Sequence, residues 1–277
     1  MKADCHIHMV LDGIDWKSSI SRGIREDHIR GVLEDYRQKG YTYLRDGGDR
    51  WNVGKFAAEI APQYGIVYKT PLAPICKKGH YGSFIGTCWE TMGDFARMVA
   101  AHRQAGGDFI KIMISGLMDF DRFGVLTEPG LTPQEIQQLC HIAKEEGFSV
   151  MAHCNGAESA IAAALAGVDS IEHGAYLNED ALQAMKEADT VWVPTLSTVG
   201  NLLGKGRFRE DAVRAILDSA LSNVAQFREI GGLLAPGTDA GAWAVPHGCQ
   251  TEEYWFSKAG VTHSHLIPGT EMIQRKF

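Results

Sequence analysis

Six residues of the types that bind metal ions or transfer protons lie within short apolar segments or at their ends. They are His6, His8, Lys111, His153, His173 and Asp239. Residues 3–9 predict a strand in which His6 and His8 share one face with Asp4, so both rings could bind one metal ion. A single histidine at a strand end is more often a hydrogen-bonded structural residue, and an aspartate before Ala-Gly can form a turn. A metal site is therefore expected only if the six residues meet.

Lys111 is the residue that its surroundings explain least. Residues 108–116 are apolar on both alternating faces, with β-branched and aromatic side chains, which predicts a buried strand. An ammonium group in such a strand would lose its hydration. Either the strand lies at a sheet edge and the lysine reaches water, or burial lowers the pKa of the amine. A neutral amine could act as a nucleophile, a base or a modified ligand.

Strand-like and helix-like segments alternate along the chain. The predicted strands are residues 3–9, 41–45, 66–69, 108–116, 149–153, 170–172, 191–194 and 233–237. Helical periodicity follows each of them, with a capped helix start at Thr132, and residues 76–90 form a long loop. Eight such units predict an α/β fold, a closed (β/α)8 TIM barrel over residues 1–260 with a short C-terminal tail, 261–277. A doubly wound open sheet is the alternative, but histidines stand where its phosphate-binding glycine loop would follow the first strand.

The barrel would bring the six residues together, because the carboxyl ends of all its strands meet at one mouth. Four histidines and a carboxylate suit zinc and its neighbours in the first transition row. They are too many for one tetrahedral site that keeps an open position. Two divalent metal ions, most simply Zn2+, fit better, and such a pair needs a bridging anion. Lys111 could supply it if its neutral amine adds carbon dioxide to form a carbamate.

Composition narrows the class of protein. The 277 residues are 45% hydrophobic and 22% charged, as in ordinary globular proteins. A net charge of −7 without a basic stripe argues against a nucleic-acid partner, and no apolar run has membrane-spanning length. The first strand begins almost at Met1, and the six cysteines form no CxxC motif. We therefore expect a cytoplasmic protein with reduced thiols, no signal peptide and a small-molecule substrate; a homo-oligomer is left open.

Eight short motifs resemble the amidohydrolase superfamily of metal-dependent hydrolases, in particular its imidazolonepropionase and Xaa-Pro dipeptidase-like branch. They are DCHIH at 4–8, RDGG at 45–48, FIKIM at 109–113, HCNG at 153–156, IEHG at 171–174, VPT at 193–195, GTDAG at 237–241 and PHG at 246–248. The resemblance implies that His6, His8 and Asp239 bind one metal ion, and His153 and His173 the other, with carboxylated Lys111 as the bridge. Relatives also carry a β-sandwich domain built from sequence before the first strand and after the last helix. Because the first strand begins at the start of this sequence, we expect either a barrel-only member or an incomplete sequence.

The resemblance also implies a reaction. A metal-bridging hydroxide would attack a carbonyl, and Asp239 would move its proton to the leaving nitrogen, cleaving a C–N bond of a small amide, lactam or dipeptide. The alternatives are a lactonase or phosphotriesterase-like hydrolase on the same centre, a mononuclear deaminase, which usually lacks the bridging lysine, and an inactive metal-binding remnant.

Substrate-binding residues are predicted from their position after strands. They are His80, Tyr81, Met118 and His247, with Phe120 and Trp243 beside them. Packing within loops is the alternative for each. Aromatic rings mixed with hydrogen-bonding imidazoles suit a small substrate better than a polymer.

Overall fold

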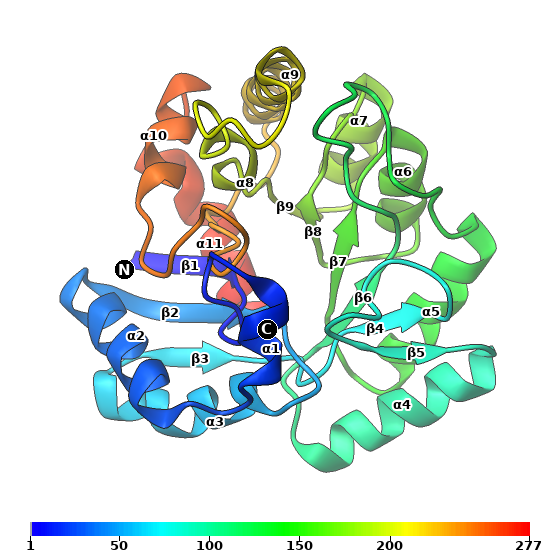
Figure 1. The fold of residues 1–277 in the computed structure, drawn as a ribbon. Helices are drawn as coiled ribbons and strands as arrows, with labels where there is room; N and C mark the ends of the chain where they lie inside the picture. The colour runs from blue at the N-terminus through cyan, green and yellow to red at the C-terminus, as the bar shows by residue number, and fades with distance from the viewer. Residues whose placement is uncertain (1) are drawn as a thin grey trace.

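Two parallel sheets form the wall of the barrel in the computed structural model, which describes residues 2–277 (Figure 1). The first sheet has the order β1 (Lys2–Ile7), β2 (Tyr41–Asp46), β3 (Val67–Lys69). The second has the order β5-β4-β6-β7-β8-β9. Its strands are β4 (Ile75–Lys77), β5 (Thr87–Trp89), β6 (Ile110–Met113), β7 (Val150–Cys154), β8 (Ser170–His173) and β9 (Val191–Val193). All neighbouring strands run parallel, as alternating β and α elements require.

Backbone hydrogen bonds outside the regular strands join the two sheets. Residues 233–240, predicted to contain the eighth strand, bond to Trp192 of β9, to Cys5 of β1 and to His8, directly after β1. They do so without forming a regular ladder, as the isolated bridges Trp192–Leu234 and Ile7–Ala240 indicate. On the other side, Asp108 N donates to Thr70 O (3.0 Å), which links the end of β3 to the start of β6. The predicted TIM-barrel-like fold is therefore confirmed.

Helices cover the outside of the strands (Figure 1). They are α1 (Trp16–Ser21), α2 (Glu26–Gln38), α3 (Val53–Ile60), the 3-10 helix η1 (Ala61–Tyr64), α4 (Met92–Ala105), α5 (Pro133–Glu145), α6 (Ala157–Leu165), α7 (Glu179–Glu187), α8 (Ser197–Gly200), α9 (Glu210–Glu229) and α10 (Thr251–Lys258). The predicted start of α5 is confirmed, since Thr132 and Glu135 cap it reciprocally. None of the helices within residues 2–277 is long and apolar enough to cross a membrane.

Helix α11 (His263–Lys276) forms where the sequence predicted a tail, despite Pro268 inside it. Its residues Ile273 and Phe277 join an apolar layer inside the barrel with Phe109 and Met151. Above this layer, the Arg45 guanidinium lies 4.5 Å from the centre of the Phe277 ring. The lower half of the barrel is therefore filled with side chains, and the polar residues lie above them.

Two further differences concern residues 76–90. The segment predicted as a loop contains the short strands β4 and β5 at its start and near its end. Cys76 and Cys88 face each other in these strands, with Cα atoms 4.6 Å apart, and form a disulfide. The prediction that all cysteines are reduced is therefore wrong for this pair, which sequence spacing alone does not reveal. Cys5, Cys140, Cys154 and Cys249 are free.

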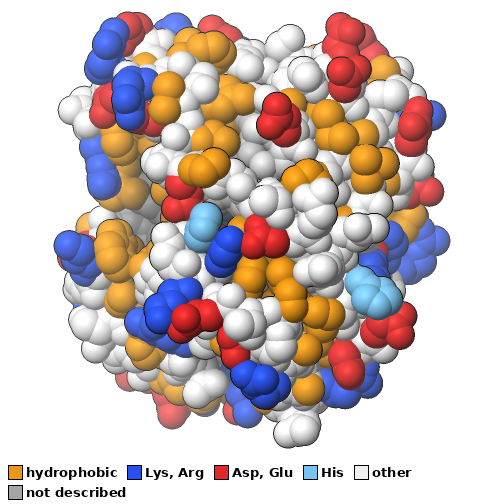
Figure 2. Space-filling view, turned by 90° about the vertical axis from the view of Figure 1, so that its right-hand side faces the viewer, with side chains coloured by type: hydrophobic (Ala, Val, Ile, Leu, Met, Phe, Trp, Pro, Cys, Tyr) orange, Lys and Arg blue, Asp and Glu red, His pale blue; other side chains and the backbone are white. Residues whose placement is uncertain are grey.

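The surface carries mixed charge on the face that Figure 2 shows. Lys and Arg side chains alternate with Asp and Glu, and hydrophobic side chains lie between them. No continuous basic stripe crosses this face, in line with the net charge of −7.

Candidate metal centre

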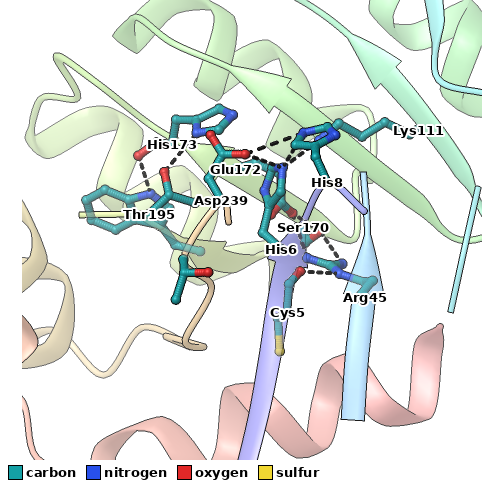
Figure 3. Close-up of polar contacts among 12 residues, drawn as sticks. Cys5, His6, His8, Arg45, Lys111, Ser170, Glu172, His173, Thr195 and Asp239 are labelled. Carbon is teal, nitrogen blue, oxygen red and sulfur yellow. Dashed lines mark hydrogen bonds and ion pairs between the residues drawn. The ribbon is translucent and has the colours of Figure 1, made fainter. Parts of the chain in front are cut away.

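His6 on β1 and His8, directly after β1, lie beside Asp239, near the end of the closing segment 233–240 (Figure 3). His6 Nε2 lies 3.4 Å from His8 Nε2 and 3.6 Å from Asp239 Oδ1, and His8 Nε2 lies 3.4 Å from the same oxygen. Within residues 2–277, this is the group of histidine, cysteine and acidic side chains whose ligand atoms converge closely enough for one metal ion. We refer to these three residues as the metal triad.

The separations in the metal triad suit a small divalent ion. Ligand atoms around a tetrahedral zinc ion, with bonds of about 2.0–2.1 Å, lie roughly 3.3–3.4 Å apart. Asp239 Oδ1 is buried and accepts no hydrogen bond from the described residues. Three groups that can each present a lone pair to the same point repel one another unless a cation lies between them. The donor set therefore fits a metal ion.

The histidines of the site are neutral. Burial, reinforced by the nearby Lys111, lowers the pKa of His8 and His153 to about 3 and that of His6 well below its usual value. The pKa of His173 is also far below its usual value because of burial and the neighbouring His153. Neutral imidazoles keep a lone pair for a metal ion.

His153 and His173, on β7 and β8, lie next to the metal triad. Their ring centroids are 4.6 Å apart, and the His173 ring is 5.1 Å from that of His6. His173 Nδ1 is hydrogen-bonded to Thr195 Oγ1 (2.8 Å), and His153 Nε2 to Gly116 O (3.2 Å). A carbonyl can only accept, so His153 donates from Nε2 and its Nδ1 keeps the lone pair.

Lys111 points into the same site from the middle of β6. Its side chain is 1% exposed, and Nζ lies 3.4 Å from His6 Nε2. Strand β6 has β4 on one side and β7 on the other, so the sheet-edge alternative does not hold. Burial lowers the pKa of the Lys111 amine, while Glu172 and Asp239 oppose this shift. The four histidines, Lys111 and Asp239 are thus brought together as the sequence predicted.

Asp239 is held by the residues around it. It adopts a left-handed backbone conformation (φ 56°), and its N–H donates to His6 O (2.7 Å). The preceding Thr238 donates from its N–H and its hydroxyl to Asp4, which is fully buried. Burial raises the pKa of Asp239 above its usual value, and the nearby Lys111 opposes this.

The expectation that Asp4 shares a face with both histidines is not met, because β1 is irregular. Its pairing with β2 shifts register between Asp4 and Ile7. The Asp4 carboxylate faces Thr238, whereas His6 faces Glu172 across the barrel. Strict period-two alternation therefore fails at the site, where a local irregularity redirects the side chains.

The predicted substrate residues lie at different depths. The Tyr81 ring lies 4.7 Å from His153, and His80 Nδ1 lies 3.5 Å from Glu128, which also accepts from Tyr81 N–H. Met118 is buried in a separate apolar cluster that also contains Phe120 and Trp243. His247 Nε2 is hydrogen-bonded to Leu11 O (2.9 Å), and its ring lies against Tyr36. Tyr81 is thus the one for which a contact with a metal-site histidine is seen.

Sequence reasoning assigned no role to the residues that support these ligands. Glu172 accepts from His6 and from Arg45, Thr195 is bonded to His173, and Asn155 donates to Gly116 O and lies 3.4 Å from His153. All but Gly116 stand within the motifs that carry the family resemblance, next to or near a predicted ligand. Their position beside the predicted ligands is the sequence feature that could have identified these supporting residues.

No protein-family model matches the chain. Ochratoxinase from Aspergillus niger is 28% identical over 219 residues, which are 76% of this chain and 43% of that protein. An uncharacterized protein of Mycobacterium bovis is 34% identical over 117 residues, 40% of this chain and 31% of its own length. The chain thus spans less than half the length of these relatives.

Solved structures resemble the chain over nearly all of its length. A Xaa-Pro dipeptidase with bound methionine in its active site superposes with a TM-score of 0.75 at 22% identity, covering 99% of this chain and 72% of that one. The crystal structure of A. niger ochratoxinase gives a TM-score of 0.77 at 24% identity, covering 96% and 69%. The chain therefore has the fold of amidohydrolase-family proteins, and the predicted resemblance to that family is confirmed.

Proposed function

We propose that the protein is a metal-dependent hydrolase that cleaves a C–N bond in a small amide, lactam or dipeptide. The observation that carries this proposal is the metal triad, together with the buried Lys111 amine 3.4 Å from His6. The similarity to ochratoxinase and to a Xaa-Pro dipeptidase supports the same class of reaction. Dipeptides with proline in second position are therefore the first substrates to test.

Two divalent metal ions are proposed as cofactors, zinc being the simplest choice for these ligands. His6, His8 and Asp239 would hold one, His153 and His173 the other, and Lys111, carboxylated by carbon dioxide, would bridge them. When bound, such ions polarise a carbonyl oxygen and lower the pKa of a water molecule. The lowered pKa of Lys111 supports the carbamate, since only a neutral amine adds carbon dioxide.

The chain's own residues would then manage the proton. Oδ1 of Asp239 faces the histidines, so its second oxygen is left to take a proton from the attacking water and return it to the leaving nitrogen. Burial raises the pKa of the Tyr81 phenol, which keeps its proton near neutral pH. Because the Tyr81 ring lies 4.7 Å from His153, its hydroxyl would be within reach of a substrate bound at the site and could donate to a substrate oxygen.

The test combines metal analysis with a substrate panel. Protein prepared with ample zinc should hold about two metal ions per chain and hydrolyse members of a panel of Xaa-Pro dipeptides, N-acyl amino acids and lactams. Lactones and phosphotriesters serve as the counter-panel, and preference for them would favour a lactonase or phosphotriesterase-like hydrolase instead. A stable stoichiometry of one metal ion per chain, with full activity, would contradict the dinuclear centre and favour the mononuclear alternative. If the protein binds metal ions but hydrolyses no compound, the alternative of an inactive metal-binding remnant is favoured.

A further inference from the structure

We infer that Glu172, held in place by Arg45, fixes the tautomer of His6 and thereby sets the metal affinity of the metal triad. Glu172 is a positioning residue, since it acts through His6. The inference rests on the metal site that the proposed function requires, and it adds a residue pair to which that function gives no role.

The hydrogen bonds of Glu172 allow only one tautomer of the His6 ring (Figure 3). Glu172 lies on β8 and is fully buried, and its Oε2 is 2.8 Å from His6 Nδ1. Its other oxygen accepts from Arg45 Nη2 (2.8 Å) and from Ser170 Oγ (2.6 Å). An ionised carboxylate can only accept, so His6 must donate from Nδ1. The lone pair of His6 is then on Nε2, the atom that faces His8 and Asp239.

Arg45 holds the Glu172 carboxylate where it is needed. It is fully buried on β2, and its Nε donates to Cys5 O (2.7 Å) while Nη1 donates to Ser170 Oγ (2.9 Å). Its guanidinium lies above the Phe277 ring of the apolar layer. A buried carboxylate without a cation would be costly, and a buried guanidinium equally so. The pair is therefore fixed by contacts to β1, β8 and the apolar layer.

A second explanation is that the pair only ties β2 to β8. The two explanations differ in what Glu172→Gln does. The amide can still accept from Arg45 through its oxygen, but its NH2 group then faces His6 Nδ1. His6 must accept there, which moves its proton to Nε2 and points an N–H at the metal triad. The reverse orientation of the amide would set the NH2 group against Arg45.

Asp169→Asn is the matched control. Asp169 is a buried carboxylate directly before β8, at the opposite end from Glu172, and it accepts from Lys144, Lys276 and Val150 N–H. This variant removes the charge of a buried carboxylate that pairs with two partly exposed lysines, without touching His6. Both variants should lower the free energy of unfolding, so stability alone cannot produce a difference in metal affinity between them.

Zinc affinity is measured by competition with a chromophoric chelator, and the His6 tautomer by 15N NMR of the metal-free protein. We expect Glu172→Gln to bind zinc about 10–100-fold more weakly, as found when partners of metal-ligating histidines are removed, with His6 protonated at Nε2. Asp169→Asn should stay within roughly twofold of the unmodified protein, since the ligands and their partners are untouched.

Unchanged zinc affinity in Glu172→Gln would overturn the inference. So would an Nε2-protonated His6 in the unmodified metal-free protein, a result that needs no variant to fold. Failure of the proposed function is separate. If Glu172→Gln loses zinc affinity but the unmodified protein hydrolyses no amide, the inference holds and the proposed function is contradicted. If the unmodified protein hydrolyses amides but Glu172→Gln keeps its zinc affinity, the proposed function holds and the inference is contradicted.

Discussion

Three histidines of the site each have one ring nitrogen engaged by the protein, which leaves the other for a metal ion. His6 uses Nδ1 toward Glu172, His173 uses Nδ1 toward Thr195, and His153 uses Nε2 toward Gly116. The second nitrogen of each ring is then available at the mouth of the barrel. Fixed rings lose little entropy on metal binding, so the site is organised before a metal ion arrives.

Asp239→Asn should lower hydrolysis by roughly 10²–10⁴-fold, because a carboxamide cannot carry the proton that Asp239 is proposed to move. The fold should survive, since asparagine tolerates the left-handed conformation of this residue. Asp189→Asn makes the same change at an exposed residue with a similar φ of 51° and should leave turnover unchanged. Steady-state rates and circular dichroism of both variants check this. Near-normal turnover in Asp239→Asn would reduce Asp239 to a turn residue.

Lys111→Met should fold and lose the second metal ion. Methionine has a similar length and no charge to desolvate, so the buried position tolerates it. The metal content should fall from about two ions per chain to about one, for want of the bridging anion. After incubation with 13C-labelled bicarbonate, a carbamate carbon signal should appear in NMR spectra of the unmodified protein and be absent from the variant.

Lys77→Met provides the control for this change. Lys77 lies on the neighbouring β4, is partly exposed and pairs with Glu135, away from the metal site. It should keep both metal ions and the carbamate signal. An unmodified protein with two bound metal ions and no carbamate signal would show that some other group bridges them.

The turn after β2 must leave room for His8, and Gly47 provides it. A Cβ atom at Gly47 would lie 2.6 Å from His8 Nε2 and would overlap the ring. Gly47→Ala should therefore displace His8 and weaken zinc binding by about 10–100-fold. The larger loss is expected if His8 no longer reaches the metal ion. Gly31→Ala in α2 meets nothing within 4 Å and should stabilise the helix by up to about 1 kcal/mol without changing zinc affinity. Chelator competition and urea unfolding of both variants test this, and equal zinc affinities would contradict it.

Strand and helix alternation was enough to predict the barrel, because a strand-like segment followed by helical periodicity recurs eight times along the sequence. The sequence did not predict β4, β5 or α11. The two strands are three residues long and lie in a glycine-rich segment, too short for periodicity to register. In α11, Pro268 argues against a helix, but burial of Leu266, Gly269 and Ile273 outweighs this.

The ligands of the candidate site could be predicted because each lies on a wall strand or directly after a predicted one, and the carboxyl ends of the strands meet at one mouth. Their partners could not be assigned. Arg45 and Glu172 are 127 residues apart, and nothing in either local sequence specifies the other. Opposite orientations of Asp4 and His6 likewise follow from a register shift that only the paired strands reveal.

The whole molecule buries ionisable groups whose pKa values move in opposite directions. Burial lowers the pKa of His8 and His153 to about 3 and that of His247 to about 4. Below about pH 6.5 the unfolded chain binds protons that the folded metal-free protein does not, so the free energy of unfolding falls as the pH falls. Burial raises the pKa of Asp46 to about 7 and that of Glu252 to about 8. Above about pH 4 these carboxyl groups bind protons in the folded state only, so their contribution falls as the pH rises.

The metal-free protein should therefore be most stable near pH ~6.5. Below about pH 6.5, more histidines than carboxyl groups change their protonation on unfolding, so the free energy of unfolding falls as the pH falls. Between about pH 6.5 and 8 only the carboxyl groups contribute, so it falls as the pH rises. The lowered pKa of Lys111 acts above that range with the opposite sign. Urea unfolding of the metal-free protein at half-unit pH steps would give the profile.

Glu252→Gln tests which group causes the fall above the maximum. Glu252 is buried and accepts the N–H groups of Leu196 and Ser197 at the start of α8. An amide accepts only one of them, so the variant should be less stable throughout. Its slope between about pH 6.5 and 8 should nevertheless be shallower by up to about 1.4 kcal/mol per pH unit, the contribution of one proton. A variant with the slope of the unmodified protein would mean that Glu252 is already ionised in the folded state. Its two N–H donors would then outweigh the cost of burying its charge.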